Sequence, residues 1–241
     1  MTNQKIIITG GTSGIGYELV KKLHKHNQII VISRNIEKLE DLKKDFFNIC
    51  IYKADLSILD ETKNVIKRIF EKFDFIDILI NNAAIQNKAH FIDKEFDELS
   101  IEKEININFT SICLLCHGFL PLLNKSKNPK ILNVNSGLAL CAKTSSSVYC
   151  GTKAALNIFS DSLRHQLENT NIKILEVFLE LVDTNMSQDR GVKMISADRA
   201  AFMIINGLEK NIYENDIGKV KLLRLILRFF PSLAKKIMKR S

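Results

Sequence analysis

The feature that most constrains the fold is an alternation of short apolar runs with longer segments of helical periodicity. The apolar runs span 5–9, 28–33, 48–54, 75–81, 130–136 and 172–179, and helices are expected at about 14–26, 35–46, 58–73, 98–124, 148–169 and 197–210. Each run is nearly continuous in apolar residues, as in a strand that is buried on both faces. The alternation therefore predicts an α/β fold, a doubly wound parallel sheet with helices on both faces.

The domain organisation is predicted to be simple, because the 241 residues contain no internal repeat, low-complexity tract or linker. Hydrophobic residues make up 46% and charged residues 26%, as in ordinary soluble domains. The net charge of +8 comes from 219–241, which holds eight basic and no acidic residues. We expect one domain over 1–218, followed by a basic amphipathic segment over 219–241. No nucleic-acid partner is expected, because the bases form a tail and not a folded face.

The five cysteines indicate a reducing compartment. Their number is odd and the first residues carry no secretion signal, so we expect free thiols and a cytoplasmic protein. Cys113 and Cys116 form a C-x-x-C pair in an apolar context with no second pair. Burial in a core helix is the favoured interpretation of this pair, and no metal site is predicted.

A glycine-rich stretch, "TGGTSGIG" (9–16), joins the first strand to the first helix. Gly10, Gly14 and Gly16 permit a tight turn and a close approach of backbone to a pyrophosphate. The following helix would present free N–H groups and a positive dipole end to that anion. A turn that merely joins strand to helix is the alternative, and the position after the first strand favours the nucleotide site.

The end of the second strand reads "ISRN", where Arg34 follows Ser33 and no acid is present. An acid at this place would select a free ribose 2′-hydroxyl, whereas a guanidinium can pair with a 2′-phosphate. NADP(H) is therefore favoured as cofactor and NAD(H) stays open. The alternative is a surface arginine that only begins the next helix.

Three polar residues are predicted to meet at the carboxyl edge of the sheet. Ser136 ends the fifth strand, and Tyr149 and Lys153 lie one turn apart near the start of the next long helix. In open α/β sheets, sites form at this edge. Taken singly, each could be an ordinary strand-end or helix-surface residue.

Together these stretches resemble the short-chain dehydrogenase/reductase family of the Tyr-x-x-x-Lys type. The matching stretches are "TGGTSGIG" (9–16), "ADL" (54–56), "NNAA" (81–84), "ININF" (105–109), "NVNSG" (133–137), "YCGTK" (149–153) and "LVDT" (181–184). They occur in the family's order and spacing and cover nearly the whole chain.

The resemblance implies hydride transfer between NADP(H) and a carbonyl or secondary alcohol. It implies that Tyr149 is the general acid/base, that Lys153 favours the phenolate and holds the nicotinamide ribose, and that Ser136 hydrogen-bonds the substrate oxygen. Asn108 is implied to distort its helix and to hold a water that relays protons. The implied cofactor-binding residues, besides Tyr149 and Lys153, are Gly10, Thr12, Ser13, Gly14, Ile15, Gly16, Ser33, Arg34, Asp55, Leu56, Asn82, Ala83, Ala84, Val182 and Thr184.

Four positions depart from the family pattern. Ala84 replaces a glycine, which would cost strain if its φ were positive, and Ser13 stands where many NADP-dependent members have a base. Leu179 and Glu180 replace Pro-Gly, and Glu180 either recognises a polar or cationic substrate group or faces solvent or a surface base. The stretch 185–196, a lid in the family, is short and polar and does not indicate the substrate.

The tail leaves two interpretations open. Its apolar side either packs on the domain or across an oligomer, or it makes weak contact with an anionic membrane surface. A break is expected at Pro231. We expect a homodimer or homotetramer that uses the helices at 98–124 and 148–169. The alternative functions are a nucleotide-binding sensor and a peripheral membrane adaptor without turnover.

Overall fold

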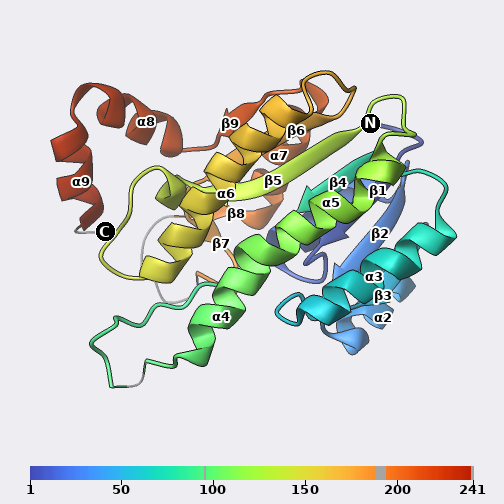
Figure 1. Ribbon diagram of the computed structural model, residues 1–241, viewed down its shortest axis with the longest axis horizontal. Coiled ribbons are helices and arrows are strands. Elements are labelled where there is room, and N and C mark those ends of the chain that lie inside the picture. The colour runs from blue at the N-terminus through green and yellow to red at the C-terminus, as the bar shows by residue number, and fades with distance from the viewer. Residues whose placement is uncertain (95, 188–193, 240–241) are drawn as a thin grey trace.

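Seven parallel strands form the central sheet of the computed structural model, which describes residues 1–94, 96–187 and 194–239 (Figure 1). The strands are β1 (Lys5–Thr9), β2 (Gln28–Ser33), β3 (Ile49–Lys53), β4 (Ile78–Asn81), β5 (Lys130–Ser136), β6 (Lys173–Leu179) and β9 (Glu214–Asp216). Their order in the sheet is β3-β2-β1-β4-β5-β6-β9. From β1 the chain first adds strands on one side of the sheet, β2 and β3, and then on the other side, beginning with β4. This order confirms the predicted doubly wound α/β fold.

Helices cover both faces of the sheet. They are α1 (Gly14–Leu23), α2 (Ile36–Asp45), α3 (Leu59–Lys72), α4 (Leu99–Ile105), α5 (Ser111–Leu123), α6 (Ser147–Gln166), α7 (Ala197–Glu209), α8 (Val220–Phe229) and α9 (Pro231–Lys239). Buried residues of α1, α2 and α7 belong to the core cluster on one face, and those of α3, α5 and α6 to the cluster on the other. The sheet is thus shielded from water on both sides.

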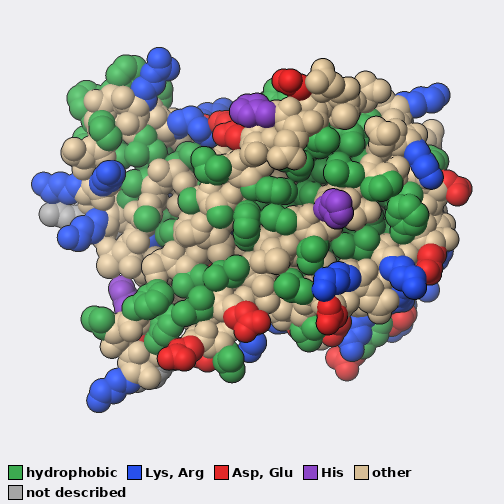
Figure 2. Space-filling view, viewed as in Figure 1, with side chains coloured by type: hydrophobic (Ala, Val, Ile, Leu, Met, Phe, Trp, Pro, Cys, Tyr) green, Lys and Arg blue, Asp and Glu red, His purple; other side chains and the backbone are tan. Residues whose placement is uncertain are grey.

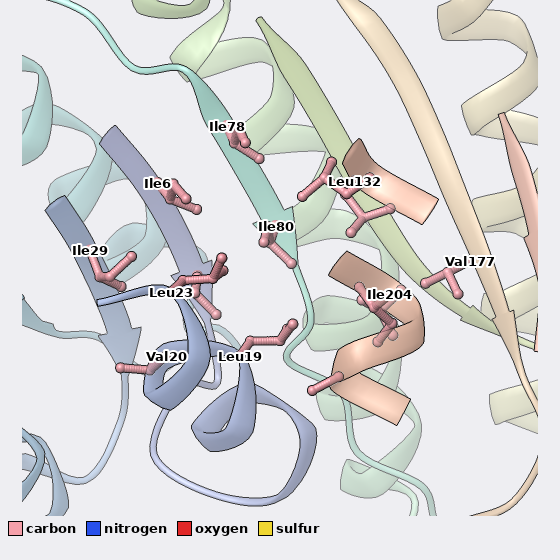
Figure 3. Packing of buried hydrophobic residues seen from close by; sticks show 14 of the residues in the cluster. Ile6, Leu19, Val20, Leu23, Ile29, Ile78, Ile80, Leu132, Val177 and Ile204 are labelled. Atoms are coloured by element: carbon pink, nitrogen blue, oxygen red, sulfur yellow. The ribbon is translucent and has the colours of Figure 1, made fainter. Parts of the chain in front are cut away.

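Alternation along each strand divides the core into these two clusters. Ile6 and Ile8 pack towards α1 and α7, whereas Ile7 between them packs towards α3 and α5. Figure 3 shows the first cluster, in which Leu19 of α1 and Ile204 of α7 approach the strands. All five side chains are at most 1% exposed, so the near-continuous apolar runs are explained by burial on two faces.

Several boundaries differ from those expected. The helix predicted at 98–124 is interrupted by a π-helical turn over Asn106–Thr110, and the strand predicted at 75–81 begins only at Ile78. Strand β9 was not expected, because "END" is short and polar and joins the sheet only as an edge strand beside β6. Strands β7 (Val182–Asp183) and β8 (Ile195–Ser196) were not expected either, because each has only two residues, and they pair with each other in a separate sheet.

The stretch Leu99–Leu123 is long and apolar enough to cross a membrane by length and composition. Leu115, Phe119 and Leu123 in it are fully buried against the sheet and α3, which identifies it as a core helix. The expected oligomer contacts through this helix and α6 remain a prediction. The break expected at Pro231 is confirmed, since α8 ends at Phe229 and α9 begins at Pro231.

Candidate active site

One cleft of about 960 Å³ lies at the carboxyl ends of the strands. Nearly every residue singled out from the sequence lines it: Gly10, Thr12, Ser13, Gly14, Ile15, Gly16, Ser33, Arg34, Asp55, Leu56, Asn82, Ala83, Ala84, Ser136, Tyr149, Lys153, Val182 and Thr184. Asn108 is the exception, because it is fully buried behind the wall. The fold therefore brings the glycine loop and the Tyr-x-x-x-Lys helix to the lining of a single cavity.

The glycine loop is packed so closely that side chains are excluded. Gly10 and Gly14 have φ values of 68° and 51°, in the left-handed region that glycine adopts without strain. A Cβ on Gly16 would lie 2.2 Å from the carbonyl oxygen of Gly10 and 2.6 Å from Nδ2 of Asn82. The first turn of α1 contains no acidic residue, so its N–H groups face the cleft without a competing anion.

The end of β4 is tied to the end of β1. The hydroxyl of Thr9 accepts hydrogen bonds from the backbone N–H groups of Asn82 and Ala83, both at 3.0 Å. The side-chain amide of Asn82 donates to the carbonyl of Thr9 at 2.9 Å. Ala84 is not among the residues with positive φ, so the loss of the family's glycine causes no backbone strain here.

Two cations that follow β2 line the same cleft. Arg34 comes directly after β2 and is exposed, and Lys38 lies in the first turn of α2. Asn35 caps α2 by accepting a hydrogen bond from the N–H of Lys38 at 2.8 Å. The sequence reasoning missed Lys38, and no helical spacing links it to Arg34, because Arg34 precedes the N-cap of α2.

Lys153 and Tyr149 lie on one face of α6 and are almost fully buried. The Lys153 ammonium donates to the carbonyl of Val134 at 2.8 Å and lies 5.7 Å from the centre of the Tyr149 ring. Burial lowers the pKa of Lys153 to about 8, and the negative charge of Glu176 opposes this decrease. Ser136 lines the same cleft, and its hydroxyl accepts a hydrogen bond from Leu138 N–H at 3.2 Å.

Two buried polar residues, Asn135 and Glu176, lie next to these residues, and the sequence reasoning did not identify them. The amide of Asn135 donates to the carbonyl of Lys153 at 3.0 Å and to Oε1 of Glu176 at 2.5 Å, and its oxygen accepts from Ser136 N–H at 2.8 Å. Glu176 is 0% exposed, and its Oε2 has no hydrogen-bond partner among the described residues. Burial raises the pKa of Glu176 to about 7, against the lowering effect of the Asn135 hydrogen bond.

Asn108 lies in the π-helical turn. Its side-chain oxygen accepts from Ile85 N–H, and its amide donates to the Ile85 carbonyl, both at 2.9 Å. The amide also approaches the hydroxyl of Thr152 at 3.3 Å, and that hydroxyl donates to the carbonyl of Tyr149. Asn108 thus joins the segment after β4 to the helix that carries Tyr149, because the wider turn directs its side chain towards both.

The remaining wall is formed by the segment after β6 and by the C-terminal helices. Glu180 lines the cleft and packs against Gly218, where a Cβ would meet its carboxylate at 1.8 Å. Val220, Leu223 and Met238 come from α8 and α9 and were not expected to contribute. Residues 188–193 of the predicted lid lie outside the described residues.

A doubly wound sheet with a glycine loop at the point of reversal, and a Tyr-x-x-x-Lys helix at the same edge, is the architecture of dinucleotide-binding α/β oxidoreductases. Residues 4–194 match the short chain dehydrogenase family. The chain belongs to this family.

Individual relatives agree with this assignment. The chain is 33% identical over 232 residues to an uncharacterized oxidoreductase, DltE, of Bacillus subtilis, covering 93% of this chain and 92% of that protein. It is 31% identical to an NADP-dependent 3-hydroxy acid dehydrogenase of Schizosaccharomyces pombe, covering 78% and 74%. A short chain dehydrogenase from Burkholderia cenocepacia, solved in complex with NADP, shares the fold with a TM-score of 0.87 at 21% identity and 98% coverage of both chains.

Proposed function

We propose that the protein is an NADP-dependent oxidoreductase that transfers a hydride between the cofactor and a carbonyl or secondary alcohol. The observation that carries this proposal is that Tyr149, Lys153 and Ser136 line the same cleft as the glycine loop. The cleft thus combines backbone suited to bind a dinucleotide with side chains suited to proton transfer. The reaction needs both in one cavity, because the cofactor and the substrate must be held together.

The residues present fit a dinucleotide. A Cβ at Gly16 would collide with the Gly10 carbonyl, so only glycine lets α1 start this close to the loop, where its free N–H groups would meet a pyrophosphate. Arg34 after β2 and Lys38 in the first turn of α2 would hold a 2′-phosphate, because a guanidinium and an ammonium both form charge-assisted hydrogen bonds with phosphate oxygens. The fission yeast relative is named as NADP-dependent and the Burkholderia structure holds NADP, which supports the same preference.

The nicotinamide, when bound, supplies the hydride in reduction and accepts it in oxidation. In reduction, Tyr149 donates its phenolic proton to the substrate oxygen, and the Ser136 hydroxyl hydrogen-bonds the same oxygen. With a pKa of about 8, Lys153 is mainly an ammonium at neutral pH, and its positive charge stabilises the phenolate that remains. Asn108, fixed by Ile85, is proposed to hold the water through which the proton is replaced.

The first experiment is thermal unfolding of the purified protein with NADPH, NADP, NADH and NAD in parallel. A ligand present at about 100 times its Kd raises the free energy of unfolding by about 2.7 kcal/mol, which is about 5–10 °C for a chain of this size. We expect NADPH to stabilise the protein more than NADH does. Equal shifts would remove the NADP preference, and no shift with any of the four would refute the site.

The chemistry is tested with Tyr149→Phe, which removes only the phenolic hydroxyl. We expect it to keep the NADPH-induced stabilisation and to lose turnover on a panel of aldehydes and ketones by about 100- to 10,000-fold. A Tyr149→Phe protein with undiminished turnover would overturn the assignment of Tyr149 as general acid.

A further inference from the structure

The C-terminal helices α8 and α9 present an apolar surface outward as well as inward. Val220, Leu223 and Ala234 face the domain and are largely shielded. Six large apolar side chains of the same segment remain 49–64% exposed: Leu222, Leu225, Phe229, Phe230, Leu233 and Ile237. Packing on the domain therefore accounts for only one side of this segment.

The exposed apolar residues follow a helical stripe. Leu222, Leu225 and Phe229 recur at intervals of three and four residues, which places them on one face of α8. Leu233 and Ile237 repeat the interval of four in α9. We call these five residues together with Phe230 the outer apolar surface.

Basic residues border the outer apolar surface. Lys221 and Arg228 are exposed on α8, and Lys235, Lys236 and Lys239 are on α9. Figure 2 shows blue lysine and arginine side chains intermixed with green hydrophobic ones at the left end, over α8 and α9. Arg224 does not belong to this group, because its guanidinium makes a bidentate pair with Asp216 at 2.7 and 2.9 Å.

Arg224 instead fixes the position of α8 on the domain. Besides Asp216, its guanidinium lies 3.0 Å from Glu214, and Thr144 donates to the carbonyl of Lys239 at 2.6 Å to hold the end of α9. The pair of helices is thus anchored with its stripe outward. In Figure 1 it projects from the same end of the molecule as the segment between β4 and α4, where Phe91 and Ile92 are 60% and 93% exposed.

We propose that the outer apolar surface of α8 and α9 docks on an anionic lipid bilayer. An apolar stripe bordered by Lys and Arg matches the boundary between acyl chains and acidic headgroups. A second copy of the chain would fit less well, because 219–241 holds no acid to pair with the bases of its counterpart. Docking would place the cleft, whose wall includes Val220, Leu223 and Met238, next to the lipid.

The test is co-sedimentation of the full-length protein with vesicles of phosphatidylcholine alone or with about one quarter phosphatidylglycerol. We expect binding only to the anionic vesicles, with release at about 1 M salt, where the Debye length is about 3 Å. Leu225→Ser with Phe229→Ser should weaken binding by at least about tenfold. Lys221→Gln with Arg228→Gln should weaken it by about tenfold or more.

Matched controls keep the test specific. Phe202→Ser removes an aromatic residue of α7 that is 57% exposed, and Lys43→Gln with Lys67→Gln removes two exposed bases far from the tail. These variants should bind anionic vesicles like the parent protein. The absence of binding to anionic vesicles, or binding that both tail variants leave unchanged, would overturn the proposal. A molecular mass by light scattering that halves in Leu225→Ser with Phe229→Ser, without any vesicle binding, would assign the surface to a second copy instead.

Discussion

The buried carboxyl group of Glu176, which is hydrogen-bonded to Asn135, is expected to make the stability of the protein depend on pH. Its carboxylate is 0% exposed, one of its oxygens accepts from Asn135, and burial raises its pKa from 4.5 to about 7. The positive charge of Arg164 lowers this pKa, and the negative charges of Glu214 and Asp161 raise it. The folded protein therefore holds a proton on Glu176 between pH 4.5 and about 7, whereas the unfolded chain has released it.

The sign and size of the effect follow from this difference. Since the folded state binds more protons in that window, the free energy of unfolding falls as pH rises from 4.5 to about 7. At roughly 1.4 kcal/mol per pH unit, the loss from Glu176 is about 3 kcal/mol. Above pH 7 this contribution does not change further, because Glu176 is then ionised in both states.

Glu176→Gln keeps the shape of the side chain and removes its titration. We subtract the free energy of unfolding of the parent from that of the variant at each pH. This difference should be about 3 kcal/mol larger at about pH 8 than at about pH 5, because only the parent loses stability as the pH rises. This corresponds to roughly 6–12 °C in Tm for a chain of this size. Urea unfolding of both proteins at the two pH values measures it directly.

The control is Glu71→Gln, since Glu71 is 63% exposed, lies 3.9 Å from Lys67 at the surface and is not among the charges that act on Glu176. Its stability relative to the parent should vary much less between the two pH values. If the difference between Glu176→Gln and the parent is the same at both pH values, Glu176 does not change its charge in this range and the reasoning fails.

Three further predictions concern the cleft. Gly16→Ala should lower the free energy of unfolding by about 1–3 kcal/mol and abolish NADPH-induced stabilisation in thermal unfolding, because its Cβ meets the Gly10 carbonyl at 2.2 Å. Gly151→Ala is the matched control in a helix, where a Cβ meets nothing within 4 Å, and it should raise stability by about 0.5–1 kcal/mol. Arg34→Leu should raise the Kd for NADPH by about 10- to 100-fold and leave that for NADH unchanged in a titration. Glu180→Gln should raise KM about tenfold for cationic carbonyl substrates and not for neutral ones, and equal KM values would exclude substrate recognition by Glu180.

The sheet was predictable from the sequence because its strands are buried on both faces. Short continuous apolar runs such as "KIIIT" and "QIIVIS" are typical of central strands in a parallel sheet that is covered on both faces. The observed β1 and β2 match these runs residue for residue. Strand β9 was not predictable in the same way. Its three residues include Glu214 and Asp216, and it becomes a strand because β6 offers a free edge and Arg224 pairs with both acids.

The cleft residues near the glycine loop were predictable because their spacing is local. Gly10, Gly14 and Gly16 lie in one short stretch between the end of β1 and the start of α1, and Tyr149 and Lys153 lie on one helix face. The part of the cleft wall formed by Val220, Leu223 and Met238 was not predictable, because no local pattern tells where the inner sides of α8 and α9 pack. The periodicity of the tail predicted an amphipathic segment with a break at Pro231, but only the anchoring of α8 by Arg224 determines which of its sides remains outward.

The buried pair of Glu176 and Asn135 was also not predictable from the sequence, because its residues lie on different strands. Within "KILEVFL", Glu176 is one polar residue in an apolar strand, and its partner Asn135 lies in a different strand and is not its directly paired neighbour. An ionisable group in such a place is costly unless it is hydrogen-bonded or neutral. Here Asn135 satisfies one oxygen of Glu176 and also donates to the Lys153 carbonyl, so the carboxyl is connected to the helix that carries Tyr149 and Lys153. The charge on Glu176 also opposes the decrease in the pKa of Lys153, so a change in its protonation would alter the fraction of ammonium beside Tyr149.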